Sequence, residues 1–141
     1  MMMDATTGKS MDKYLIDSSI WIKYLQGKDD AVRERIQTLL DEDRISINGV
    51  IFSELLVAAG SKKEFQFIKE HFSGLHFLET NRDFYIKLAK MTKEFQRIGH
   101  ILPFPDLAKI VHAHLWSHTL LCSDKKIRDA GQEVGVRFEI L

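Results

Sequence analysis

Cysteine, net charge and long apolar runs are what this sequence has least of. A single cysteine, Cys122, rules out an intramolecular disulfide framework and fits a reducing compartment, so we expect a cytoplasmic location. The 20 basic and 20 acidic residues cancel, so any binding of nucleic acid must come from local patches rather than from a global field. No apolar run approaches the length of a membrane span, so we expect no membrane-spanning segment.

What remains is a chain of ordinary globular composition, with 45% hydrophobic and 28% charged residues. Its 141 residues are typical of one domain with a sizeable core. The N-terminal residues lack the apolar centre of a signal peptide. We therefore expect residues 1–12 to form a flexible leader and residues 13–141 to form the domain.

Short apolar segments alternate with longer segments of helical periodicity. The pattern predicts five strands, at residues 14–17, 45–48, 75–78, 119–122 and 137–140. It predicts helices between them, at residues 19–26, 30–40, 50–59, 62–72, 81–98, 105–116 and 124–130. Such alternation favours an α/β layer fold with a mostly parallel sheet.

Several polar residues and glycines indicate where these helices begin and end. Asp30 and Asn81 have the side chains and positions of N-caps, and Ser61 with Glu64 forms the pattern of a capping box. Gly60 stands where a helix would end on a glycine.

Four carboxylates occupy less ordinary places. Asp17, Asp106 and Asp124 each end a short apolar run, where an aspartate can equally be a helix cap worth about 1 kcal/mol. Glu54 lies inside the apolar stretch of residues 50–57, and its neighbours at helical spacing are apolar, so we expect it on a buried face. A buried carboxylate needs a cationic partner or a metal ion.

Parallel α/β sheets open their ligand crevice at the carboxyl ends of the strands. Asp17 and Asp124 directly follow predicted strands, and Glu54 and Asp106 lie on helices that can reach the same edge. Convergence of four acids there predicts a site for Mg²⁺ or Mn²⁺, both of which prefer oxygen ligands.

The segments around these acids resemble the motifs of the PIN-domain ribonucleases, the class that includes VapC-type toxins. Residues 15–25 resemble the family's opening strand, aspartate, hydroxyl-rich turn and aromatic helix. Residues 51–55, 102–110 and 121–124 resemble its second, third and fourth acidic motifs. The resemblance runs over almost the whole chain from Tyr14 onward.

This resemblance implies a three-layer α/β/α sandwich and an acidic metal site formed by Asp17, Glu54, Asp106 and Asp124. It implies that Ser19 positions a metal-bound water, and that the activity is metal-dependent hydrolysis of RNA. It also implies a toxin with a cognate antitoxin, whose basic or aromatic tail covers the acidic cleft, and a homodimer. We expect phosphate contacts from the basic residues that follow the fourth acid, Lys125, Lys126 and Arg128.

The chain departs from the family pattern in two places. The helix after Asp106 carries Lys109, His112 and His114 where many relatives have alanines. In the fourth motif Cys122 stands where a threonine is common. The position of Cys122 in an apolar segment also predicts an inert, buried thiol.

Other functions stay open at this stage. A non-catalytic PIN-like module that binds RNA or protein and a housekeeping RNA-processing nuclease are both compatible with the motifs. A zinc site at His112, His114 and His118 would require ligands that the sequence does not supply in a tidy set. A phosphorylatable receiver domain would need an acid pair after the first strand, where only Asp17 stands.

Overall fold

The computed structural model describes residues 12–141, which form five strands and seven helices. The strands are β1 (Tyr14–Ile16), β2 (Ile45–Asn48), β3 (His76–Leu78), β4 (Thr119–Cys122) and β5 (Phe138–Ile140). The helices are α1 (Ser18–Gln26), α2 (Asp30–Asp41), α3 (Gly49–Ala58), α4 (Lys62–Phe72), α5 (Arg82–Arg97), α6 (Phe104–Leu115) and α7 (Lys125–Glu133).

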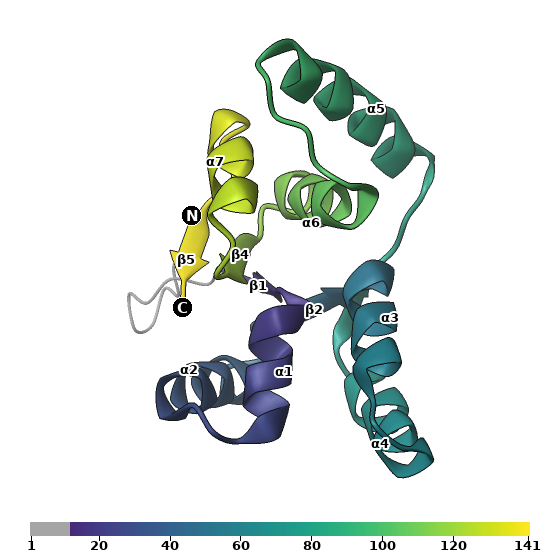
Figure 1. The fold of residues 1–141 in the computed structure, drawn as a ribbon, viewed down its shortest axis with the longest axis vertical. Helices are drawn as coiled ribbons and strands as arrows, with labels where there is room; N and C mark the ends of the chain where they lie inside the picture. The colour runs from purple at the N-terminus through teal and green to yellow at the C-terminus, as the bar shows by residue number, and fades with distance from the viewer. Residues whose placement is uncertain (1–11) are drawn as a thin grey trace.

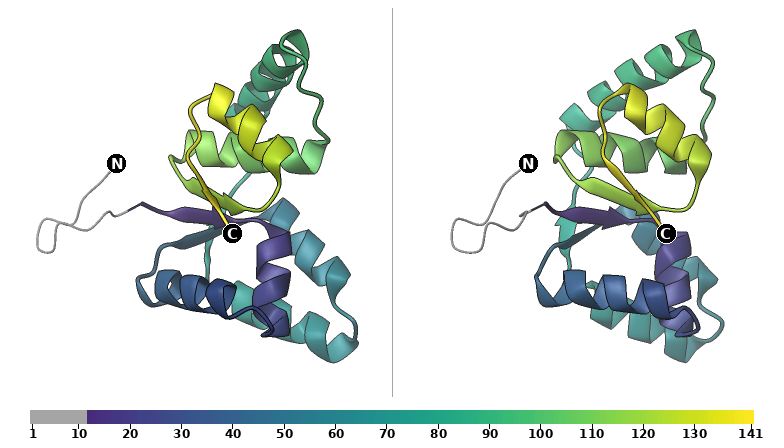
Figure 2. Two further views of the ribbon diagram at one scale, coloured as in Figure 1. Left: turned by 60° about the vertical axis from the view of Figure 1, so that its left-hand side comes forward. Right: turned by 90° about the vertical axis from the view of Figure 1, so that its left-hand side faces the viewer.

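All strand pairs in the sheet are parallel, in the order β3-β2-β1-β4-β5. Helices α1 to α4 cover one face and α5 to α7 cover the other, as Figures 1 and 2 show. Every residue of β1, β2 and β4 is buried, because helices lie on both sides of these strands. The predicted three-layer α/β/α sandwich is confirmed.

The parallel register brings the carboxyl ends of the central strands together. Ile16 of β1 pairs with Leu121 of β4, and the next amide, that of Asp17, donates a hydrogen bond of 2.9 Å to the carbonyl oxygen of Leu121. Asp17 therefore leaves the sheet beside the end of β4. Ser123 and Asp124 follow β4 and lead into α7.

Most predicted elements agree with the structure to within one or two residues, and α7 is the exception. It continues to Glu133 instead of stopping before the glycine at position 131. Gly131 is a packing position rather than a helix terminator. A Cβ atom there would lie only 2.5 Å from the ring of Phe138, so only glycine lets α7 lie this close to β5.

The helix caps correct two predictions. Asp29, not Asp30, caps α2 by accepting a 3.1 Å hydrogen bond from the amide of Val32, and Asp30 lies in the first turn. Gly60 has no left-handed backbone, and α3 ends one residue earlier with Ala59 as its C-cap. The caps predicted at Asn81 and Ser61 are confirmed.

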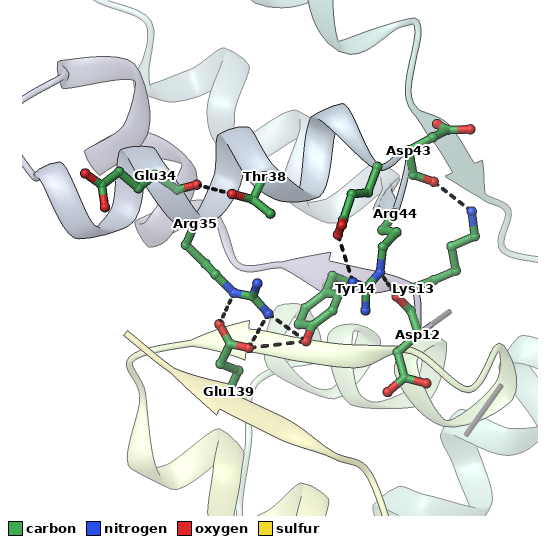
Figure 3. A network of polar contacts seen from close by, with 10 residues as sticks. Asp12, Lys13, Tyr14, Glu34, Arg35, Thr38, Asp43, Arg44 and Glu139 are labelled. Atoms are coloured by element: carbon green, nitrogen blue, oxygen red, sulfur yellow. Dashed lines mark hydrogen bonds and ion pairs between the residues drawn. The ribbon is translucent and has the colours of Figure 1, made fainter. Parts of the chain in front are cut away.

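A polar network at the start of β1 ties the last strand to α2 (Figure 3). Arg35 of α2 donates two hydrogen bonds to the carboxylate of Glu139 in β5, at 2.6 and 2.7 Å. It also donates a 2.9 Å bond to the hydroxyl of Tyr14, which itself donates to Glu139 at 3.2 Å. This network lies at the opposite end of β1 from Asp17.

Of the predicted N-terminal leader, residues 1–12, only Asp12 falls within the described residues. Among residues 12–141, none of the helices combines the length and the apolar character needed to cross a membrane.

Candidate active site

Three of the four singled-out carboxylates meet around one lysine at the carboxyl edge of the sheet. The Nζ atom of Lys109 lies 2.7 Å from Oδ1 of Asp17, 3.1 Å from Oε1 of Glu54 and 3.8 Å from Oδ1 of Asp106. The lysine side chain is 4% exposed, so its charge is withdrawn from water and depends on these acids.

Asp17 both caps a helix and belongs to the acidic cluster, two roles that the sequence left as alternatives. Its Oδ1 accepts a 2.9 Å hydrogen bond from the amide of Ser18 and so caps α1. Its Oδ2 accepts a 3.0 Å bond from the hydroxyl of Ser19. The residue is buried, so Asp17 is the carboxylate that most needs Lys109.

Glu54 reaches the cluster from α3, but it does not lie on the buried face that its apolar neighbours predicted. Its side chain is 36% exposed, and Val57, one turn further along, is 85% exposed. Ile51 and Leu55 form the buried face instead. One carboxylate oxygen of Glu54, Oε1, is nevertheless buried, and its charged neighbour among the described residues is the ammonium nitrogen of Lys109 at 3.1 Å.

Asp106 lies in the first turn of α6, three residues before Lys109 and on the same side of the helix. It is not the cap of this helix, because Pro103 occupies that position without a side-chain hydrogen bond. Burial raises the pKa of Asp106, and the charges of Asp124, Asp17 and Glu54 raise it further against the opposing effect of Lys109.

Asp124 is at the periphery of this group. It caps α7, accepting hydrogen bonds from the amides of Lys126 at 2.8 Å and Ile127 at 3.3 Å. It is exposed, and the described contacts do not pair it with Lys109. Its charge adds to the effect of burial in raising the pKa of Asp106.

Lys109 is the site residue whose role sequence reasoning missed. Its position was visible only as a departure from the family's alanines, although a lysine three residues after Asp106 within an apolar helix signals a buried cation. Burial on its own would lower the pKa of Lys109, but Asp17 and Glu54 outweigh this effect and the pKa is raised. The lysine is therefore a fixed positive charge inside the cluster.

The basic residues after Asp124 follow it into α7, and they differ in exposure and in their hydrogen-bond partners. Lys125 and Lys126 are exposed in the first turn of α7. Arg128 is half-buried and donates two hydrogen bonds of 3.1 Å to its neighbour Asp129, which neutralises much of its charge.

The histidines of α6 and the following turn hold the core together. His112 accepts a hydrogen bond from the side-chain amide of Asn48 at 3.0 Å and donates to the carbonyl of Glu79 at 3.2 Å. His118 accepts from the hydroxyl of Ser46 and donates to the carbonyl of Trp116, both at 2.8 Å. These ring nitrogens are already engaged, which argues against the zinc alternative.

Cys122 is fully buried in β4, and burial raises the pKa of its thiol to about 11. The predicted burial of this thiol is confirmed. The raised pKa favours the protonated thiol over the reactive thiolate, in line with the expected inertness.

The donor chemistry of the cluster fits a hard divalent cation. All the candidate donors are carboxylate oxygens, and the buried Oε1 of Glu54 already lies 3.1 Å from the ammonium nitrogen of Lys109, the position of a bound cation. Yet within residues 12–141 no three His, Cys, Asp or Glu side chains are grouped as metal ligands. At the cluster, the ammonium group of Lys109 takes up the space between the acids.

Residues 14–133 match the model of the PIN domain family, and the chain belongs to this family. No curated protein sequence matches the chain at a significant level.

Solved structures with the same fold come from VapBC complexes. A chain of DNA-bound VapBC from Salmonella typhimurium is 20% identical, with a TM-score of 0.76 over 92% of this chain and 98% of that chain. VapBC2 from Rickettsia felis, bound to a promoter DNA fragment, is 18% identical, with a TM-score of 0.74 over 91% and 98%. VapBC-5 from Mycobacterium tuberculosis, a member of the VapBC family of toxin–antitoxin systems, is 16% identical, with a TM-score of 0.61 over 92% and 97%. At these identities the likeness shows the fold alone.

Proposed function

We propose that this protein is a Mg²⁺- or Mn²⁺-dependent endoribonuclease and the toxin of a toxin–antitoxin pair. The observation that carries the proposal is the meeting of Asp17, Glu54 and Asp106 at the carboxyl edge of the sheet. Membership of the PIN domain family supports it. The segments around these three residues also resemble the family's acidic motifs.

In this proposal, Asp17, Glu54 and Asp106 hold the divalent cation, and Asp124 acts directly or through a bound water. A bound divalent cation supplies an acidified water and neutralises charge that develops on the phosphate. Ser19 orients the Asp17 carboxylate through its 3.0 Å hydrogen bond and positions water beside it. Lys125 and Lys126 bind backbone phosphates of the RNA, and Arg128 contributes less because Asp129 already binds it.

The test is cleavage of single-stranded RNA with Mg²⁺ or Mn²⁺. Asp17→Asn should lower the rate by more than about a hundredfold, because even changes outside the ligand shell of a metal cost 10- to 100-fold. Glu54→Gln, at a more exposed position, should also lower it. Cleavage that survives excess EDTA, or that Asp17→Asn leaves intact, would refute the proposal.

The matched control is Asp30→Asn, which makes the same chemical change on the surface of α2. Asp30 is exposed, and its ion-pair partner among residues 12–141 is Arg33, so activity should remain at the wild-type level. Circular dichroism of the variants separates loss of activity from loss of fold.

An apolar groove in the helical layer that carries Glu54 supports an antitoxin partner. A groove of about 630 Å³ runs between α1, α3 and α4, and Leu55, the neighbour of Glu54, lines it. Its walls are largely apolar, formed among others by Ile22, Leu25, Ala58, Phe67 and Ile68. A segment with apolar side chains in the groove and a basic residue at the acids would satisfy both surfaces. An adjacent antitoxin gene would favour a toxin over a housekeeping RNA-processing nuclease.

The burial of Lys109 among the acids favours one second candidate, a non-catalytic module that binds RNA or protein. In that case the ammonium group would permanently satisfy the carboxylates. Binding of RNA without cleavage at any Mg²⁺ or Mn²⁺ concentration would support this candidate over the nuclease.

A further inference from the structure

The cluster contains its own cation. Lys109 extends from α6 into the space between Asp17, which begins α1, and Glu54 on α3, and its side chain is 4% exposed. The three carboxylates within 3.8 Å carry three negative charges against the single positive charge of the lysine. The site is therefore partly compensated and still attractive to a cation.

The lysine and a divalent cation require the same oxygens. Nζ lies 2.7 Å from Oδ1 of Asp17, the distance of a charge-assisted hydrogen bond. Mg²⁺ binds carboxylate oxygen at about 2.0–2.1 Å. A cation bound to this oxygen at that distance would lie within about 5 Å of the ammonium nitrogen, and the two positive charges would repel each other in a buried site.

We propose that Lys109 is a resident counter-ion that competes with the divalent cation for Asp17 and Glu54, and so sets the affinity of the site for metal. This inference rests on the proposed metal-dependent function. Without metal, Lys109 holds α1, α3 and α6 together at the sheet edge. With metal, Nζ withdraws from the two carboxylates, so binding of the cation includes the cost of displacing the lysine.

The first experiment compares Mn²⁺ binding by the wild type and by Lys109→Met, followed by electron paramagnetic resonance of free Mn²⁺. Methionine keeps a long unbranched side chain and removes the charge. The variant should bind Mn²⁺ at least about tenfold more tightly, because a like charge is removed from within a few ångströms of the ion. Lys93→Met, on the exposed face of α5, should bind as the wild type does.

Thermal unfolding gives a second readout. Without metal, Lys109→Met should unfold at a lower temperature than the wild type, because the acids lose their counter-ion. Mn²⁺ should then raise its melting temperature by more than it raises that of the wild type. Equal or weaker Mn²⁺ binding by the variant, or no binding by either protein, would overturn the inference.

A measurement on the wild type covers the case in which Lys109→Met does not fold. The buried ammonium of Lys109 should give a ¹⁵Nζ resonance protected from solvent exchange, assigned by its absence from Lys109→Arg. Mg²⁺ should shift this resonance and abolish its protection. Backbone shifts of the site on addition of Mg²⁺ with an unchanged Lys109 signal would contradict competition.

These readouts also separate the inference from the proposed function. Tighter Mn²⁺ binding by Lys109→Met without RNA cleavage by any variant would refute the nuclease and support the competition. Metal-dependent cleavage by the wild type with unchanged Mn²⁺ affinity in Lys109→Met would support the nuclease and refute the competition.

Discussion

Single side chains in this protein connect elements that lie far apart in the sequence. Lys109 links three acids from three segments, and Arg35 links α2 to the C-terminal strand through Glu139. Both are cations with carboxylate partners, but they differ in exposure. Lys109 is enclosed, whereas the Arg35 and Glu139 side chains are 31% and 30% exposed. The contribution of the Arg35 pair to stability is therefore moderated by solvent.

At this scale we predict a measurable coupling between Arg35 and Glu139. A double-mutant cycle of Arg35→Met and Glu139→Gln in urea unfolding should give about 1 kcal/mol, since the pair is bidentate but partly exposed. Hydrogen bonding by Arg35 lowers the pKa of Glu139 from its ordinary 4.5. The coupling should thus be present above pH 4.5 and be lost as the pH falls through the lowered pKa.

The control for this cycle is the pair Asp30 and Arg33, one turn apart on the surface of α2 at 2.9 Å. Its side chains are 80% and 53% exposed, so its coupling should be clearly smaller. An Arg35–Glu139 coupling no larger than that of the surface pair would show that the network in Figure 3 adds nothing to stability.

At the scale of elements, two buried histidines attach α6 and the turn after it to β2. His112 binds Asn48, whose other side-chain atom, Oδ1, caps α3 by accepting from Ile51. Because Oδ1 of Asn48 is engaged by Ile51, its NH₂ group faces Nδ1 of His112. Protonation of Nδ1 would place a second N–H donor opposite this NH₂ group and break the hydrogen bond. His118 makes the corresponding link to Ser46. Both links fix the layer that carries Lys109 against the sheet.

These links predict a loss of stability in mild acid. Burial lowers the pKa of His112 and of His118. Below about pH 6.5, these histidines bind protons in the unfolded chain but stay neutral in the folded protein. The free energy of unfolding therefore decreases as the pH is lowered, by up to about 1.4 kcal/mol per pH unit for each histidine. Urea unfolding between pH 7.5 and pH 5.5 measures this slope, in a range above the titration of most carboxylates.

His118→Gln should make the slope shallower, because glutamine can still bind Ser46 but does not titrate. His71→Gln, at an exposed position on α4, should leave the slope unchanged. A slope that is the same in all three proteins would mean that the buried histidines are not its source.

At the scale of the molecule, the two helical layers leave several large apolar side chains exposed. On and next to α5 and α6 these are Tyr85, Ile86, Ile101, Phe104 and Trp116. The apolar stripe of α5 itself belongs to the core, since Phe84, Met91 and Phe95 are buried. The exposed residues around it are the ones that support the expected homodimer.

We predict that the protein has twice the mass of its 16.3 kDa chain in solution, as light scattering after size-exclusion chromatography would show. Ile101, which is 87% exposed, should lie in the interface, so Ile101→Asp should shift the population to monomer. Phe65→Asp on α4, in the opposite layer, should remain dimeric. A wild type that is monomeric at all concentrations would contradict the prediction.

Much of the fold was predictable because it is encoded locally. The strands are short apolar runs and the helices are periodic segments, and both patterns involve neighbours in the sequence. The end of α7 was misassigned because the partner of Gly131 lies outside the helix: only the packing of Phe138 shows why a glycine stands there. The cap of α2 was misassigned for a local reason, because two adjacent aspartates were both candidates and only the backbone geometry shows that Asp29 makes the bond.

The sequence by itself determined the alternation of strands and helices, and with it the position of Asp17 and Asp124 at the ends of parallel strands. Only the tertiary structure decided which acids meet and what lies between them. Helix α3 is apolar on nearly all sides, so its sequence pattern does not set which way Glu54 faces. The packing of the helix leaves the Glu54 side chain 36% exposed. Lys109 acquires its role from Asp17 and Glu54, which are far from it in sequence and come within 3.1 Å only when α6 packs over the edge of the sheet.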